Sequence, residues 1–109
     1  SQTDYLVVES TYGNRQHPDT DPLKFLRDTF QKAFKQGGSV LIPAFAVGRA
    51  QQILYYIAKL KEKGEMPDFP VYLDSPMAIN ATGLYCGFRK DHKLSEDECM
   101  RTCTGAEYL

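Results

Sequence analysis

The chain has 109 residues, and its thirteen Lys and Arg residues against fourteen Asp and Glu residues give a net charge of −1 at pH 7. This length suits one small domain. The hydrophobic fraction of 42% and the charged fraction of 25% exclude disordered and collagen-like chains. The near-neutral charge also excludes the strongly basic class of autonomous nucleic-acid binders.

No run of residues approaches the roughly 18–20 apolar residues of a membrane span, and the polar first residues lack a signal-peptide pattern. We therefore expect a cytoplasmic chain without membrane contact. Cys86, Cys99 and Cys103 form no C-x-x-C pair, and zinc would need more ligands than the one-turn spacing of Cys99 and Cys103 supplies. His17 and His92 add no H-x-H spacing, so reduced thiols and no metal site are expected.

Three short apolar runs predict strands at residues 5–8, 39–43 and 70–74. Each run is unbroken and rich in β-branched or aromatic residues, which is typical of a strand buried on both faces of a parallel sheet. Helical patterns follow each of them, at about 22–36, 50–63 and 76–88, and a capping box starts a further short helix at about 96–103. Residues 104–109 give no clear signal.

This alternation predicts an α/β fold, a three-layer sandwich of Rossmann or flavodoxin-like type with a parallel sheet of at least three strands. Functional sites in such folds lie beyond the carboxyl ends of the strands. There, Glu9 is followed by Ser10, Thr11 and Tyr12. A carboxylate at this place can orient a histidine, accept a proton or bind a cation, or it can simply accept hydrogen bonds from loop amides or pair with Arg49.

Two further candidates follow the other predicted strands. Arg49 stands where the second helix begins, so its guanidinium and the free amides can face a phosphate, or it can bridge loops. Asp74 and Ser75 precede a proline, and helix capping is the favoured interpretation of this pair.

Three blocks together resemble the β-CASP branch of the metallo-β-lactamase superfamily, which includes the nuclease subunit of the cleavage and polyadenylation specificity factor and ribonuclease J. The blocks are L-V-V-E-S-T-Y-G-N-R-Q-H at 6–17, I-P-A-F-A-V-G-R-A-Q at 42–51 and V-Y-L-D-S-P-M-A at 71–78. They look most similar to the bacterial branch. The resemblance is clear over residues 4–90, and residues 91–109 do not align, so residues 1–109 are interpreted as part of one β-CASP domain.

The resemblance implies a zinc-dependent ribonuclease that hydrolyses RNA phosphodiester bonds with two zinc ions, as an endonuclease or a 5′ exonuclease. It assigns Glu9 the role of the motif A acid near the metals. It places further residues in the RNA cleft: Ser10, Thr11, Tyr12, Arg49, Asp74 and Ser75. No H-x-H-x-D-H signature is present, so we expect residues 1–109 alone to bind no catalytic zinc and to be inactive.

The expected partners are RNA and the remainder of the β-CASP and metallo-β-lactamase domains. A parallel sheet without its neighbouring strands exposes edges and apolar faces, which predicts self-association of this chain. Two other classes remain open. A phosphoacceptor receiver would use Asp74 at the end of the third strand, but the double acid after the first strand is missing. A nucleotide-binding module lacks a phosphate-loop motif.

Overall fold

Helices form where the sequence supplies capping residues. The computed structural model describes residues 2–108 and contains α1 (Pro22–Lys35), α2 (Arg49–Glu62), α3 (Pro76–Gly87) and α4 (Glu96–Thr104), with the 3-10 helix η1 (Arg89–Asp91) before α4. The Asp21 carboxylate accepts a hydrogen bond from the Leu23 amide at 3.0 Å, which caps α1. At α4, Ser95 and Glu98 form the reciprocal capping box, with bonds of 3.0 and 3.3 Å. The four predicted helices are confirmed.

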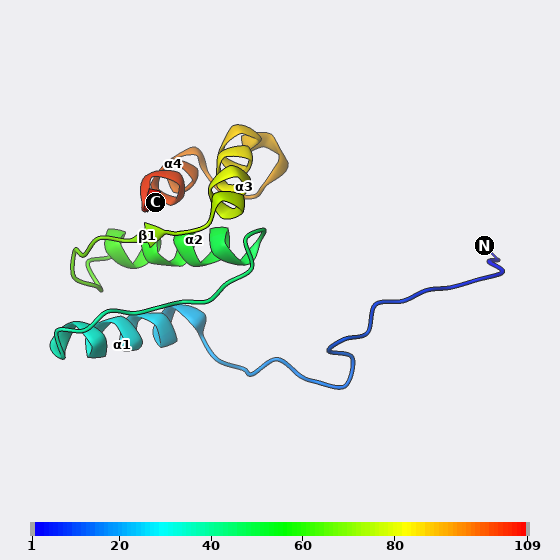
Figure 1. The fold of residues 1–109 in the computed structure, drawn as a ribbon, viewed down its shortest axis with the longest axis horizontal. Helices are drawn as coiled ribbons and strands as arrows, with labels where there is room; N and C mark the ends of the chain where they lie inside the picture. The colour runs from blue at the N-terminus through cyan, green and yellow to red at the C-terminus, as the bar shows by residue number, and fades with distance from the viewer. Residues whose placement is uncertain (1, 109) are drawn as a thin grey trace.

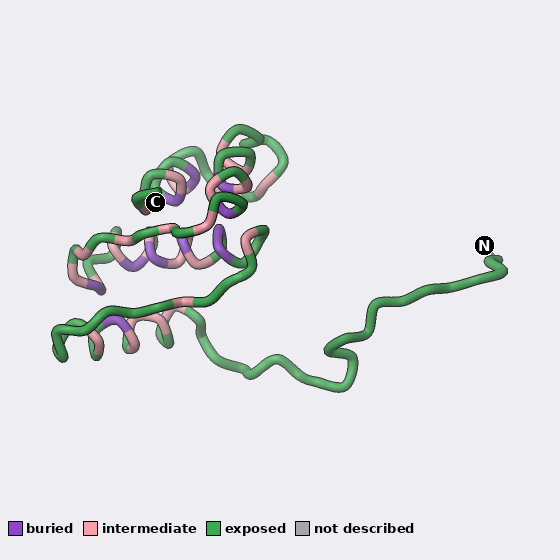
Figure 2. The backbone as a smooth tube through the Cα atoms, in the orientation of Figure 1, coloured by how far each residue is buried: buried purple, intermediate pink, exposed green. Residues whose placement is uncertain are grey.

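Helix α2 is the central element of the packed part of the chain. Figure 1 shows α1 on one side of α2, and α3 and α4 on the other. The core between α1 and α2 contains Phe30, Ile57, Leu60 and Met66, all nearly inaccessible to solvent. Figure 2 shows that the buried positions lie along α2 and on the surfaces that face it. The apolar face predicted for the second helix is therefore the face that holds the molecule together.

The sheet differs from the prediction. Within residues 2–108 there are two short strands, β1 (Tyr72–Leu73) and β2 (Glu107–Tyr108), paired in parallel. The β1 strand lies in the predicted run 70–74. Residues 5–8 and 39–43 are extended but form no strand, and the side chains of Tyr5 and Val7 are 90% and 97% exposed. An extended segment becomes a strand only when another segment pairs with it, and the N-terminal segment runs away from the helices (Figure 1).

The α/β class is thus confirmed, whereas the three-layer sandwich with three or more strands is not formed by the described residues. The cysteine expectation was wrong in part, because Cys86 and Cys103 form a disulfide bond and only Cys99 is a free thiol. Among the described residues, no helix is both long and apolar enough to cross a membrane.

Candidate functional site

An open pocket forms between the loop after the first predicted strand and the segment that leads into α2. Tyr12, Arg15 and His17 line it from the loop, and Phe45 and Arg49 line it from the other side. Its volume of ≈ 730 Å³ lies in the range of about 300–1,000 Å³ in which proteins bind small ligands. Two arginines and a histidine on one pocket make it a place where a phosphate is favoured.

The position of Arg49 is set by Gln51, a buried residue at the start of α2. The Gln51 side chain accepts a hydrogen bond from the Gly48 amide at 2.7 Å and donates to the Ala46 carbonyl at 3.0 Å. It also donates to the Thr82 hydroxyl of α3 at 2.9 Å. Gly48 has φ 84°, a conformation that favours glycine. The Gln51 side chain therefore connects the turn before Arg49 to α2, on which Gln51 lies, and to α3 through Thr82.

Arg49 itself points to solvent. Its Nη1 donates to the Gln52 side chain at 2.9 Å, and a guanidinium carries five donors in all. The remaining geometry suits a bidentate contact with an anion at the beginning of α2, where the helix dipole adds positive potential. Of the predicted cleft residues, the structure brings Tyr12 and Arg49 together in this pocket.

Glu9 lies outside this pocket. Its side chain is exposed, and Oε1 accepts a hydrogen bond from the Thr11 amide at 2.7 Å. Hydrogen bonding by Thr11, through its side chain and its backbone amide, lowers the pKa of the Glu9 carboxyl below its usual value. The carboxylate is ionised at neutral pH, and it accepts a hydrogen bond from a loop amide, which is the structural alternative that the sequence analysis left open for Glu9.

Asp74 and Ser75 lie elsewhere. The Ser75 hydroxyl accepts a hydrogen bond from the Ala78 amide at 3.2 Å and caps α3, as the capping interpretation predicted. Both residues line a second pocket, over the apolar surface of α1 and α2. Ser10 belongs to the turn closed by the Gly13 amide and the Ser10 carbonyl at 2.9 Å. The described residues therefore do not gather the predicted cleft into one surface.

A pair of catalytic metal ions does not fit the residues of this chain. With the Cys86–Cys103 disulfide formed, no group of three or more His, Cys, Asp or Glu side chains in residues 2–108 is placed to hold a metal ion. Glu9, the acid predicted to act beside the metals, is exposed in the N-terminal segment.

The sequence reasoning missed Gln51 and Thr82. Gln51 is 5% exposed and Thr82 is fully buried. A signal for Gln51 was present, because it stands three residues before Leu54 and so lies on the same helical face as the apolar residues. A polar side chain on an apolar face requires a hydrogen-bond partner, which here is Thr82.

A protein family and several known proteins are similar to this chain. The Beta-Casp domain family matches residues 50–109. Ribonuclease TTHA0252 of Thermus thermophilus is 43% identical over 83 residues, which are 75% of this chain and 19% of that protein. The RNase J-like protein of Methanocaldococcus jannaschii is 36% identical over 92 residues, 80% of this chain and 21% of that protein.

The transcription termination factor FttA of Thermococcus kodakarensis is 40% identical over 86 residues, 76% of this chain and 13% of that protein. The chain thus spans about a fifth or less of the length of these relatives. No solved structure matches it.

Proposed function

The chain belongs to the β-CASP family, and from that premise we propose that it is part of a ribonuclease and contributes to the surface along which RNA passes. The observation that carries this proposal is the pocket in which Tyr12, Arg15, His17 and Arg49 meet. It joins two of the three sequence blocks that mark the family resemblance. Relatives named as ribonucleases support the reaction class.

In this proposal Arg49 binds an RNA phosphate. Its guanidinium is exposed at the first turn of α2, and Gln51 fixes the preceding turn. Arg15 and His17 add donors from the N-terminal loop to the same pocket, and Tyr12 offers a ring on which a base can stack. Single-stranded RNA is held in this way by a positive groove together with aromatic side chains.

Glu9 is proposed as the acid of the active site. Its carboxylate is exposed, so it can orient a histidine or accept a proton from the remainder of the enzyme. Two zinc ions, held by residues outside this chain, would supply the activated water and offset the charge that develops on the phosphate. Because residues 2–108 do not fit such a pair of ions, the chain alone is proposed to be inactive.

The remaining strands are proposed to form when the sheet is complete. Residues 39–43 and residues 70–74 both line a largely apolar pocket, together with residues of α1 and α2. Both segments are extended and lie over α1 and α2, the arrangement expected of neighbouring parts of one sheet layer. The three-layer sandwich then requires residues 5–8 and the rest of the β-CASP domain, and the exposed apolar side chains predict self-association in their absence.

The experiment that tests the function measures binding and hydrolysis of single-stranded RNA by the enzyme that contains this chain. We expect Arg49→Ala to weaken binding and to lower the slope of log Kobs against log salt concentration by about 0.7, the contribution of one phosphate contact. Lys24→Ala, which removes an exposed charge on α1, is the matched control and should leave the slope unchanged. Equal slopes for Arg49→Ala and wild type would contradict the phosphate contact, and absence of RNA hydrolysis would contradict the function.

A further inference from the structure

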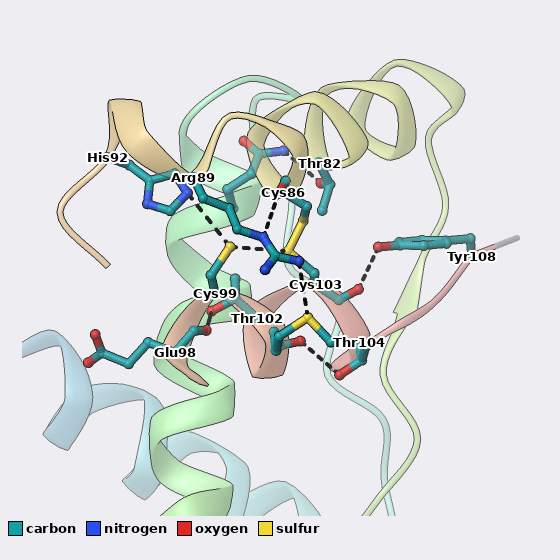
Figure 3. The surroundings of a disulfide bond; sticks show 12 residues. Thr82, Cys86, Arg89, His92, Glu98, Cys99, Thr102, Cys103, Thr104 and Tyr108 are labelled. Carbon is teal, nitrogen blue, oxygen red and sulfur yellow. Dashed lines mark hydrogen bonds between the residues drawn. A yellow bond between two sulfur atoms is a disulfide. The ribbon is translucent and has the colours of Figure 1, made fainter. Parts of the chain in front are cut away.

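The three cysteines and His92 form a chain of close contacts, although they come from different elements. Cys86 lies near the end of α3, His92 follows η1, and Cys99 and Cys103 lie one turn apart on α4. The Cys99 Sγ is 3.6 Å from His92 Nε2 and 3.9 Å from Cys103 Sγ. Cys103 is bonded to Cys86 in the structure (Figure 3).

These distances match the edges of a tetrahedral zinc site. With Zn–S of about 2.3 Å and Zn–N of about 2.0–2.1 Å, tetrahedral angles place two sulfur ligands about 3.8 Å apart and a sulfur and a nitrogen ligand about 3.6 Å apart. Both non-bonded separations at Cys99 agree with these values. The Cα atoms of Cys86 and Cys103 are 6.3 Å apart, so the two thiols remain neighbours when their bond is reduced.

We propose that the reduced chain holds one structural zinc ion on Cys86, His92, Cys99 and Cys103, and that the Cys86–Cys103 disulfide is the metal-free, oxidised form of the same site. While the disulfide is formed, two of the four ligands are unavailable, because a disulfide sulfur is not a thiolate. In the disulfide-bonded form that the structure shows, no group of three or more His, Cys, Asp or Glu side chains within residues 2–108 is placed to hold a metal ion. Three thiolates and one imidazole make a closed set, which is typical of structural rather than catalytic zinc.

The surroundings favour a fixed site. Cys99 is 1% exposed, and the ring of His92 stacks on Tyr85 with the ring centroids 4.5 Å apart. Nε2 of His92 is the ring nitrogen in contact with the Cys99 sulfur, and Nδ1 is buried with no hydrogen-bond partner among the described residues. The guanidinium of Arg89 donates to the Cys86 carbonyl at 3.4 Å (Figure 3) and pairs with the Glu96 carboxylate at 2.9 Å, which links η1 to α4 beside the site.

Conversion of the disulfide form into the zinc form balances in atoms and electrons. The disulfide takes two electrons and two protons from a dithiol reductant, which itself becomes a disulfide, and yields two thiols. Zn²⁺ then replaces the protons of three thiols, which pass to solvent. The reduced form is the one expected where thiols are kept reduced. Zinc would then tie α3, η1 and α4 together in place of the disulfide.

The test titrates the reduced chain with Zn²⁺ alone, under argon and after removal of dithiothreitol, and repeats the titration with Co²⁺ to record the visible bands of tetrahedral thiolate coordination. We expect one ion per chain. The decisive variant is Cys99→Ser, because Cys99 is not part of the disulfide. Its affinity for Zn²⁺ should fall by more than about 100-fold, beyond the usual loss of an outer partner, while its oxidised form keeps the wild-type circular dichroism.

His92→Cys should retain an ion and shift the Co²⁺ charge-transfer band, whereas His17→Asn, at the other histidine, should change neither readout. The proposal is overturned if the reduced wild type binds no zinc, whether it stays folded or not, or if Cys99→Ser binds zinc as tightly as wild type. Recovery of the Cys86–Cys103 disulfide from a reducing cytoplasm, by alkylation and mass measurement, would overturn it as well. None of these readouts depends on nuclease activity, so the outcome is independent of the proposed function.

Discussion

Replacing Gln51 with alanine tests how the candidate phosphate site is held in place. The change removes three hydrogen bonds, to the Gly48 amide, the Ala46 carbonyl and the Thr82 hydroxyl. At about 0.5–1.5 kcal/mol for each bond, and with part of the amide replaced by a cavity, we expect a loss of about 2–4 kcal/mol in the free energy of unfolding. The turn before Arg49 should loosen at the same time.

The assay is urea denaturation of the chain, followed by circular dichroism. Gln52→Ala is the matched control, because Gln52 is the next residue and is exposed, and its hydrogen bonds to Arg49 and Tyr56 are exposed as well; its effect should stay within about 0.5 kcal/mol. A double-mutant cycle with Thr82→Val should give a coupling energy of about 0.5–1.5 kcal/mol, the range of one hydrogen bond. Equal stability losses for Gln51→Ala and Gln52→Ala, or a coupling energy of zero, would show that the Gln51 hydrogen bonds do not stabilise this turn.

Three further predictions concern stability. Asp21→Ala removes the cap of α1 and should cost about 1 kcal/mol in urea denaturation; no loss would contradict the cap. Leu60→Ala, in the core at 1% exposed, should cost about 2–5 kcal/mol, whereas Leu41→Ala, 93% exposed, should cost within about 0.5 kcal/mol. Hydrogen bonding by Ser95 and Lys59 lowers the pKa of the Glu98 carboxyl in the folded chain below 4.5. The ionised Glu98 therefore stabilises the folded chain fully above the pKa of the unfolded state, and this stabilisation is lost as the pH falls through the lowered pKa. Glu98→Gln should flatten this acid limb of the stability–pH curve, and an unchanged limb would contradict the assignment.

The helices were predictable because their signals are local. An Asp or Ser before a proline, or a Ser three residues before a Glu, predicts where a helix begins. The corresponding capping hydrogen bonds are formed at Asp21, Ser75 and Ser95. The strands were less predictable because a strand requires a partner. Residues 5–8 carry a strand pattern but have no neighbour in the described chain, while β2, at Glu107–Tyr108, gave no signal and pairs with β1.

The candidate site was predictable in its chemistry and only partly in its geometry. Family resemblance pointed to Glu9 and Arg49, yet the structure joins Arg49 with Tyr12 and leaves Glu9 in solvent. Such distances depend on how distant segments pack, which a motif does not encode. The pairing of Cys86 with Cys103, across a separation of 17 residues, likewise depends on how α3 and α4 meet.

We propose that Glu9 supplies an acid to the active site of the whole ribonuclease. The most direct measurement compares the rate of RNA hydrolysis by the whole enzyme with that of its Glu9→Gln variant, with Asp19→Asn, an exposed acid in the same N-terminal segment, as the control. We predict that Glu9→Gln lowers the rate by about 10²–10⁴-fold, as expected for loss of a proton-transfer group, with RNA binding retained and the control unaffected. Wild-type rates in the Glu9→Gln variant would show that Glu9 is not an acid of the active site.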